Sequence, residues 1–577
     1  FNVVLEAPSG ADVGGVSVSF DTLTAPDGTR ISSTAASGDG VFDWRQREIE
    51  MFYVRYLQIK GLSTLAYEHY DERHIPERFR RPWVGEGRGQ GGWTDRPDHD
   101  AFYPDIAVPL ELVGEFDITR GQNQSLWVDV YIPKDAKAGT YRGTIAVAER
   151  GQVTVQIPVQ LTVRDFTLPD AASAATMLFL GYADINKRYL GQQHPAAGSA
   201  NAAKSRLVRD RHFQLARRHR ISLIDGNHGP GGVDQPSGEW LPRLEGSLFS
   251  AANGYDGPGV GKGNDIFSIG TYGAWPWKGE GEAGMRQHTD KWVQWFAANA
   301  PDTEYFLYLS DEPGSGQTAQ VEQWAQWIND NPGPGSSLKS LVTIGFPYAE
   351  RNTPSVDIPA TWADIGVKDE WQAAVDKLAA NSDKRVYMYN AKRPAAGSFA
   401  TEDDGTALRE LAWGQYKMGV DRWFFWESTY YNNFQGGTGE TNVFKTAQTF
   451  GGAAEPDAVR GEKAWNYTNG DGVLFYPGTD TVYPQESYGV LGPFASLRLK
   501  HWRRGIQDVD YLAMAAKVDP ARVAAIVDNI VPKVLWEYGV QDKSDPTWVL
   551  TDISWSKDPD VWEAARAELA DIIESGN

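Results

Sequence analysis

The segment Tyr305-Phe-Leu-Tyr-Leu-Ser-Asp-Glu-Pro313 decides the fold that we predict for this chain of 577 residues. Five apolar or aromatic residues lead, through Ser310, into two adjacent carboxylates, and Pro313 then interrupts the backbone. A short apolar run that ends in polar residues is typical of a buried parallel strand. The segment therefore predicts one strand of an α/β domain, with two acids at its carboxyl end.

Similar apolar runs lie on both sides of this segment, and helical stretches separate them. Such alternation over residues 172–455 is typical of parallel βα units, and a (β/α)₈ TIM-type barrel fits it best. Residues 230–300 are rich in loop-forming residues, so the strand count stays open there. The helix candidates are Ala319–Asn329, Trp371–Ala380 and Ala407–Met418, and the other strand candidates are Met177–Leu180, Ile221–Ile224, Leu341–Ile344, Thr361–Ile365, Arg385–Tyr389 and Arg422–Trp426.

Residues 1–168, before the predicted barrel, are rich in short alternating segments bounded by Gly, Pro and Asp. This pattern predicts an N-terminal antiparallel β-sandwich. Its clearest segments are Gly15–Phe20, Leu126–Ile132 and Val153–Ile157, with Leu161–Pro169 expected as the last strand.

Residues 456–577 follow the predicted barrel, and we expect a small C-terminal β/helical region that packs on it. A strand is predicted at Gly472–Tyr476 and a helix from Ser496 to about Ala516, with amphipathic stretches at 520–537 and 559–574. At this length the whole chain is multi-domain, with two or three large units.

The composition excludes several classes of function. A net charge of −21 argues against a nucleic-acid partner, because a polyanion would be repelled. The absence of cysteine excludes a thiol nucleophile, a thiolate zinc site and disulfides. The Gly85–Gly92 stretch does not follow a buried strand or precede a helix pattern, so we interpret it as a surface loop rather than a phosphate-binding loop.

The sequence contains no apolar run long enough for a membrane span. The chain begins at Phe1, without a methionine or a signal peptide. We interpret it as a mature protein whose signal peptide has been removed, and we expect it to be secreted, periplasmic or on the cell surface. With 22 tryptophans, the chain is also rich in aromatic residues. These can fill large cores or form platforms against sugar rings, and both interpretations stay open.

Asp311 and Glu312 lie where the active site of such a barrel forms, at the carboxyl end of a strand. Adjacent carboxylates repel each other, which favours keeping one of them protonated. A glycosidase needs such a pair, because one acid protonates the leaving oxygen while a carboxylate stabilises positive charge at C1. The alternative is structural: Asp311 caps the next helix and Glu312 pairs with an arginine.

A second candidate position follows the run Trp423–Trp426, where Glu427 begins a polar aromatic loop. Glu427 could act as a nucleophile, bind a substrate hydroxyl or serve as a structural carboxylate, and the residues do not decide between these roles. We expect no metal and no organic cofactor. The candidate substrate contacts, each with an ordinary structural alternative, are Trp426, Tyr389, Asn390, Tyr348, His228 and Tyr430.

Five motifs, taken in order, resemble the family 123-type glycoside hydrolases and the related bacterial proteins that carry the domain of unknown function 4091. The last and most specific motif is Ser496-Leu-Arg-Leu-Lys-His-Trp-Arg-Arg-Gly-Ile-Gln-Asp-Val-Asp-Tyr-Leu512. The others are Leu126–Pro133 with Ala138–Gly143, Leu309–Pro313, Gly419–Trp426 and Gly472–Gly478.

The resemblance implies the same three-part architecture and a glycosidase that degrades an oligosaccharide or polysaccharide. It also implies retaining, substrate-assisted hydrolysis of β-linked N-acetylhexosamine, typically N-acetylgalactosamine. In that scheme the acetamido oxygen of the substrate attacks C1, Asp311 orients the acetamido N–H, and Glu312 is the general acid/base.

Glu427 departs from the family pattern, and two alternatives to the implied activity stay open. If it faces Glu312 across the barrel, it could be the nucleophile of a glycosidase for non-acetamido polysaccharide. The second alternative is a non-catalytic carbohydrate-binding surface protein built on the same barrel.

Overall fold

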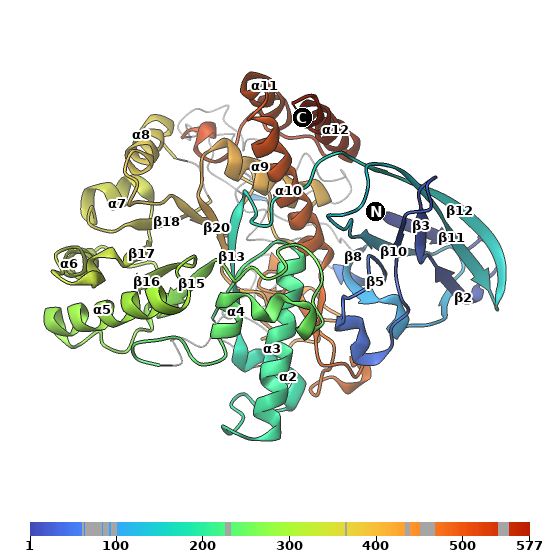
Figure 1. Ribbon diagram of the computed structural model, residues 1–577, viewed down its shortest axis with the longest axis horizontal. Helices are drawn as coiled ribbons and strands as arrows, with labels where there is room; N and C mark the ends of the chain where they lie inside the picture. Colours follow the sequence, from blue (N-terminus) through green and yellow to red (C-terminus); the bar gives the residue numbers. More distant parts are fainter. Residues whose placement is uncertain are drawn as a thin grey trace.

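The computed structural model describes residues 1–59, 63, 83–84, 92–93, 101–225, 232–363, 366–432, 439–450, 468–540 and 553–576. Figure 1 shows the N-terminal sheets on one side and the barrel on the other, with helix α10 (Leu497–Ala515) between them. Within these described ranges, no helix combines the length and the apolar character that crossing a membrane requires. Short strand pairs lie outside the main sheets: β6 (Trp83–Val84) with β7 (Gly92–Trp93), and β21 (Gln448–Phe450) with β22 (Thr468–Asn469).

Two antiparallel sheets form the N-terminal part, as predicted. Along the strands, residues that face the other sheet alternate with residues that face outward. The inward residues form a core that includes Leu23, Leu126 and Tyr141. The strand predicted at Leu161–Pro169 corresponds to the end of β12, which stops at Val163 because the chain leaves the sheet there. One sheet holds β1 (Asn2–Glu6), β10 (Asn123–Val130), β5 (Ile49–Ile59) and β8 (Ala101–Pro109), and the other holds β4 (Arg30–Ser32), β3 (Thr22–Thr24), β11 (Gly139–Glu149), β2 (Val13–Ser19) and β9 (Phe116–Ile118), with β12 (Gln152–Val163) paired to β11.

Eight parallel strands follow one another around the central barrel, and the last strand pairs with the first. Between the second and third strands the side chain of Asn264 spans the gap. Its Oδ1 accepts from the Leu223 N–H at 3.2 Å, and its Nδ2 donates to the Leu223 and Ile266 carbonyls at 2.9 and 2.8 Å. The strands are β13 (Ala175–Leu180), β14 (Leu223–Asp225), β15 (Ile266–Ile269), β16 (Glu304–Ser310), β17 (Lys339–Thr343), β18 (Ile358–Trp362), β19 (Tyr387–Tyr389) and β20 (Arg422–Phe425).

Two strands differ from the prediction. The strand expected at Thr361–Ile365 is β18 and ends at Trp362, because its buried residues begin earlier, at Ile358. The third strand, β15, was not predicted, since its four residues lie in a glycine-rich stretch. The helices that accompany the barrel are α2 (Tyr182–Leu190), α3 (Ala200–Arg218), α4 (Leu241–Glu245), α5 (Gly281–Asn299), α6 (Thr318–Asn329), α7 (Phe346–Asn352), α8 (Lys368–Ala379) and α9 (Gly405–Lys417).

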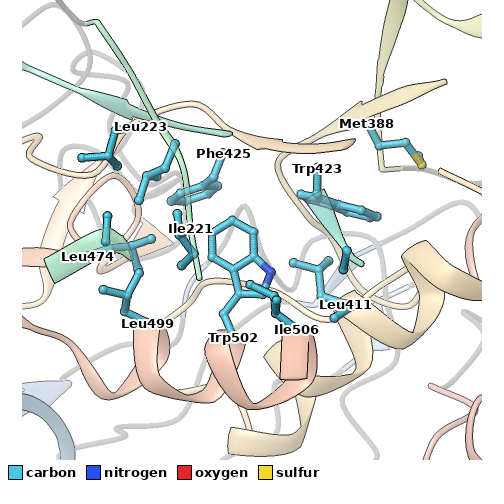
Figure 2. Packing of buried hydrophobic residues seen from close by; sticks show 14 of the residues in the cluster. Ile221, Leu223, Met388, Leu411, Trp423, Phe425, Leu474, Leu499, Trp502 and Ile506 are labelled. Carbon is cyan, nitrogen blue, oxygen red and sulfur yellow. The ribbon is translucent and has the colours of Figure 1, made fainter. Parts of the chain in front are cut away.

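The C-terminal part packs its longest helix, α10, against the barrel. Ser496 caps this helix by accepting the Leu499 N–H at 3.1 Å. The fully buried Trp502 lies beside Phe425 of β20 and Leu411 of α9 (Figure 2). The predicted strand at Gly472–Tyr476 begins later, as β23. The remaining elements are β23 (Phe475–Pro477), β24 (Pro493–Ala495), α11 (Pro520–Ile530) and α12 (Pro559–Ser575).

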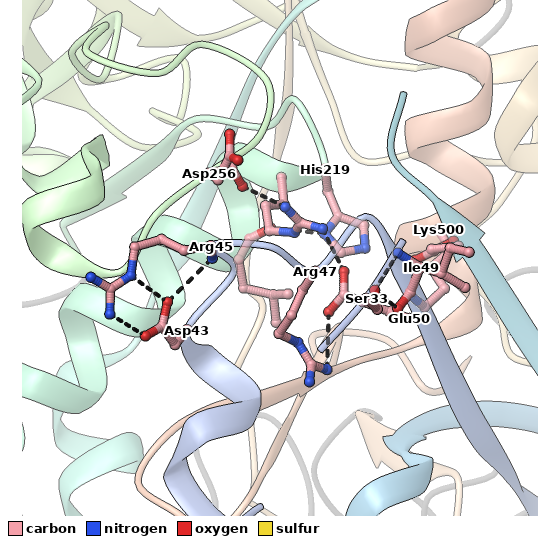
Figure 3. A network of polar contacts seen from close by, with 12 residues as sticks. Ser33, Asp43, Arg45, Arg47, Ile49, Glu50, His219, Asp256 and Lys500 are labelled. Atoms are coloured by element: carbon pink, nitrogen blue, oxygen red, sulfur yellow. Dashed lines mark hydrogen bonds and ion pairs between the residues drawn. The ribbon is translucent and has the colours of Figure 1, made fainter. Parts of the chain in front are cut away.

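Partly buried ion pairs join the sandwich to the rest of the molecule. Asp129 of β10 pairs with Lys500 at 2.6 Å and Arg503 at 2.5 Å, both on α10. Glu50 of β5, labelled in the neighbouring group of Figure 3, pairs with Arg218, the last residue of α3, at 2.5 Å. The sandwich is therefore docked through charged groups as well as apolar contacts.

Candidate active site

The acidic pair Asp311–Glu312 follows β16 directly and lies at the carboxyl edge of the barrel, as predicted. Both side chains are exposed, whereas the preceding Phe306 to Leu309 are fully buried. The apolar strand thus ends where the barrel opens to solvent, which leaves both carboxyls accessible to a ligand.

Two hydroxyl groups hold Asp311. The Tyr308 hydroxyl donates to Asp311 Oδ1 at 2.7 Å, and Thr343 Oγ1 donates to the same oxygen at 2.9 Å. Among the hydrogen bonds of the described residues, none ends on Asp311 Oδ2. The carboxylate is therefore fixed through one oxygen, and the other can accept a hydrogen bond from a substrate.

Glu312 is held through its backbone and its side chain. Its N–H donates to Thr343 Oγ1, so Thr343 contacts both acids. The Tyr389 hydroxyl donates to Glu312 Oε1 at 2.5 Å. Tyr389, which was predicted to contact substrate, positions the side chain of Glu312 through this hydrogen bond.

Three residues at the barrel mouth adopt positive φ without being glycine: Tyr272 at 58°, Glu312 at 39° and Asn390 at 54°. Each follows the end of a barrel strand, β15, β16 or β19. Such backbone conformations cost of order 1–3 kcal/mol each and cluster at functional sites. Their concentration at one end of the barrel supports placing the active site there.

Tyr272, which the sequence interpretation missed, lies at the centre of this mouth. Its hydroxyl donates to the Trp426 carbonyl, and its ring centroid lies 4.9 Å from Phe179 and 5.7 Å from Tyr308. Burial raises the pKa of Tyr272 well above its usual value, and the charges of nearby Glu427 and Asp311 act in the same direction. Tyr272 therefore connects the acidic pair to the loop after β20.

Trp426, whose carbonyl accepts the Tyr272 hydroxyl, is also held by contacts with Asp471, Tyr430 and Asn390. Its indole N–H donates to Asp471 Oδ1 at 3.0 Å, its ring lies 5.3 Å from that of Tyr430, and its backbone N–H donates to Asn390 Oδ1 at 3.2 Å. Burial raises the pKa of Asp471 to about 6. Trp426 is half-buried at the mouth, whereas Tyr430 is almost covered and Asn390 uses its side-chain oxygen within the protein.

Glu427 lies in a different environment from the exposed acidic pair. Only 4% of its surface is exposed, and its Oε1 accepts from the Ser428 N–H at 2.7 Å, the Thr429 N–H at 2.9 Å and Thr429 Oγ1 at 3.1 Å. Burial raises the pKa of Glu427 to about 8, and the charge of Asp184 contributes to the increase. A carboxyl in this state is largely protonated at neutral pH.

Two further predicted contacts are placed as follows. Tyr348 is half-buried near the start of α7, after β17. His228 lies outside the described residues, as does the rest of its loop from 226 to 231. In the part of the chain that the structure describes, no group of three His, Asp or Glu side chains could hold a metal ion.

The residues missed from sequence are Tyr272, Tyr308, Thr343 and the exposed Trp362. Three of them carried a usable signal, because Tyr308 lies within an apolar run that was identified, Thr343 lies near the end of another and Trp362 ends β18. Tyr272 carried none, since β15 before it was not recognised as a strand.

Comparison with known proteins agrees with the architecture. The model of the glycoside hydrolase 123 N-terminal domain matches residues 85–149. A family 123 glycoside hydrolase from Clostridium perfringens, whose structure was analysed for glycolipid glycan hydrolysis, has 13% identity and a TM-score of 0.60. That match covers 100% of this chain and 91% of the other. No curated protein matches.

Two more distant structures score below 0.5 and do not establish a shared fold. A β-glucuronidase from Ruminococcus gnavus has 8% identity and a TM-score of 0.27, covering 88% of this chain and 97% of its own. A glycosyl hydrolase family 2 member from Bacteroides cellulosilyticus has 10% identity and a TM-score of 0.24, covering 75% and 43%.

The match of the glycoside hydrolase 123 N-terminal domain, together with the shared fold, indicates a glycosidase, and an acidic pair lies at the carboxyl end of the fourth barrel strand. The matched N-terminal domain and the shared architecture confirm the resemblance to family 123-type glycoside hydrolases.

Proposed function

We propose that this chain hydrolyses β-linked N-acetylhexosamine glycans, of the N-acetylgalactosamine type, with retention of configuration and with the acetamido group of the substrate as nucleophile. The observation that carries the proposal is the asymmetric fixing of Asp311, whose Oδ1 accepts two hydroxyls while Oδ2 is left to face a ligand. A carboxylate held in this way is suited to accept the acetamido N–H.

In the first step the acetamido oxygen attacks C1 as the glycosidic C1–O bond breaks. Glu312 in its acid form gives its proton to the leaving oxygen, so the leaving sugar departs as an alcohol. Positive charge develops on the cyclised acetamido group, whose N–H faces the Asp311 carboxylate. Tyr308 and Thr343 keep that carboxylate in place, so the charge meets a partner that need not reorganise.

In the second step the Glu312 carboxylate takes a proton from water, and the water oxygen forms a bond with C1. The bond between C1 and the acetamido oxygen breaks, which restores the acetamido group. Two displacements at C1 give net retention. The Tyr389 hydroxyl, 2.5 Å from Glu312 Oε1, orients the acid/base in both steps.

Glu427 supports this proposal over a protein nucleophile. Its burial, its three hydrogen bonds on Oε1 and its raised pKa of about 8 describe a neutral carboxyl that anchors the loop after β20. A nucleophile needs a charged, accessible oxygen, which the buried Glu427 does not offer. Because the Clostridium perfringens enzyme was analysed for the hydrolysis of glycolipid glycans, that substrate class is the first to test.

The test is sugar release from β-linked N-acetylgalactosamine, N-acetylglucosamine and unmodified hexose substrates by wild type and Glu312→Gln. We expect release only from the acetamido sugars, with a loss of about 10²–10⁴-fold in the variant. Glu427→Gln is the matched control, because it keeps a neutral side chain of the same shape; it should retain activity within about fivefold. Cleavage of plain hexosides together with loss of activity in Glu427→Gln would refute the proposal.

A further inference from the structure

Trp362 has 43% of its surface exposed and is the most exposed tryptophan among those whose side-chain burial the structure describes. It ends β18, at the carboxyl edge of the barrel where the acidic pair lies. A ligand that covers an exposed indole removes apolar surface from water, which favours binding. The position of Trp362 at the mouth rather than on a helix face points to a ligand-binding role.

Trp362 is connected to the proposed acid/base through one residue. It lies opposite Tyr389 in the register of β18 and β19, and the two rings stack with centroids 6.4 Å apart and planes at 26°. The Tyr389 hydroxyl in turn donates to Glu312 Oε1. The Nζ atom of Lys392 lies 5.5 Å from the centre of the indole ring. These contacts fix the indole orientation, so a ligand would meet a pre-organised surface.

The geometry also indicates which sugar this surface would contact. Asp311, which would accept the acetamido N–H, is held by the hydroxyl of the fully buried Tyr308. Glu312, which marks the glycosidic oxygen, is anchored to Tyr389 on β19, next to Trp362. Along these contacts Trp362 is joined to Glu312 through Tyr389, whereas Asp311 is joined to Tyr308 and Thr343. The sugar beyond the glycosidic oxygen, which leaves in the first step, therefore lies toward Trp362.

We propose that Trp362 is the platform for the leaving-group sugar, and that this site takes a neutral hexose whose C–H face packs on the indole. The inference rests on the proposed function, because it uses Glu312 to locate the glycosidic oxygen. It assigns the preference of the enzyme to glycans in which N-acetylhexosamine is joined to a further hexose, rather than to isolated glycosides.

The test compares two substrates with the same glycone. One is a disaccharide in which β-N-acetylgalactosamine is linked to galactose; the other is methyl β-N-acetylgalactosaminide, whose leaving group is too small to reach Trp362. We expect Trp362→Ala to lower kcat/KM for the disaccharide about tenfold, the effect of losing one aromatic contact. With the methyl glycoside it should stay within about twofold of wild type.

Trp362→Phe is the matched variant, since it keeps an aromatic face and should recover most of the activity on the disaccharide. An equal loss on both substrates would overturn the inference, because Trp362 would then act through Tyr389 and Glu312 instead of through the leaving sugar. No loss on either substrate would also overturn it. If wild type cleaves neither substrate, the proposed function itself fails, and the result is distinct from these.

Discussion

Thr343 shows how much of the site depends on a single hydroxyl. Its Oγ1 donates to Asp311 Oδ1 and accepts the N–H of Glu312, so one side chain sets the relative position of both acids. The strained backbone at Glu312, with φ of 39°, needs such an anchor. We therefore regard Thr343 as a positioning residue.

Replacing Thr343 by valine should lower kcat roughly 10–100-fold, because a hydrogen bond to a charged group contributes about 1.5–3 kcal/mol. KM should change little, since the residue contacts the acids and not the substrate. Steady-state kinetics on an N-acetylgalactosaminide give both constants. Thr343→Ser keeps the hydroxyl and should restore kcat; a serine variant as impaired as the valine variant would contradict the positioning role.

At the scale of single residues, the sequence located the acids but not their supports. Asp311 and Glu312 stood out because two carboxylates directly follow an apolar strand. Thr343 and Tyr308 lie in apolar runs that were identified, but a threonine or tyrosine within a strand is also an ordinary core residue, so their role was not assigned. The burial of Glu427 was equally hidden, because residues distant in sequence, such as Gly181 and Asp184, lie beside it.

Among the elements, helix α9 carries an unusual buried acid, Glu410, on the face that packs against the loop after β19. Glu410 is fully buried, and its Oε2 accepts the Gly397 N–H at 2.6 Å. Burial raises the pKa of Glu410 to about 8 from its ordinary 4.5. The folded protein therefore keeps a proton on Glu410 that the unfolded chain releases above pH 4.5.

This difference makes stability fall as pH rises from about 4.5 to 8, by at most about 1.4 kcal/mol per pH unit for one proton. Glu410→Gln stays neutral at every pH, so it should match wild type in Tm at pH 5 and exceed it at pH 8. Thermal unfolding of both proteins at pH 5, 6.5 and 8 measures the difference, and Glu427 contributes equally to both. A Tm difference that does not change with pH would show that Glu410 is charged in the fold.

Elements with strong local patterns were predicted well. The helices α6, α8, α9 and α10 lie within a few residues of their expected positions, because each has a continuous amphipathic pattern. Strand β15 was missed, since four residues give too short a pattern to separate it from a loop. The gap beside it is bridged by Asn264, a side-chain contact that no local pattern reveals.

For the whole molecule, Arg498 of α10 connects the sandwich with the C-terminal part. It forms two hydrogen bonds with Asp105 of β8, at 2.9 and 2.8 Å, and donates to the Phe399, Gly470 and Val473 carbonyls. Asp105 is almost completely buried, at 1% exposure. The pair therefore joins three segments that are distant in the sequence.

Arg498→Met should lower the free energy of unfolding by about 3–5 kcal/mol, because it leaves Asp105 buried without its cation. Adding Asp105→Asn removes that charge and should recover part of the loss. Chemical denaturation at pH 7 compares the single variants, the double variant and wild type. If the double variant is no more stable than Arg498→Met, an unpaired charge at Asp105 is not the cause of the loss.

The architecture of the whole molecule followed from regional patterns: alternating segments, then βα alternation, then amphipathic helices. The docking of these parts did not, because ion pairs such as Arg498–Asp105 join residues nearly four hundred positions apart. The contact of Trp362 with Tyr389 was hidden for the same reason, since it requires β18 and β19 to lie side by side.

The central claim is that the acetamido group of the substrate, and not a protein carboxylate, attacks C1. The most direct test is kcat/KM for aryl β-N-acetylgalactosaminides whose acetyl group carries zero, one, two or three fluorines, each of which weakens the attacking oxygen. Substrate assistance predicts a steep fall along the series, amounting to several orders of magnitude for the trifluoroacetyl compound. A kcat/KM that stays within about threefold across the series would contradict substrate assistance and would indicate that a protein group is the nucleophile.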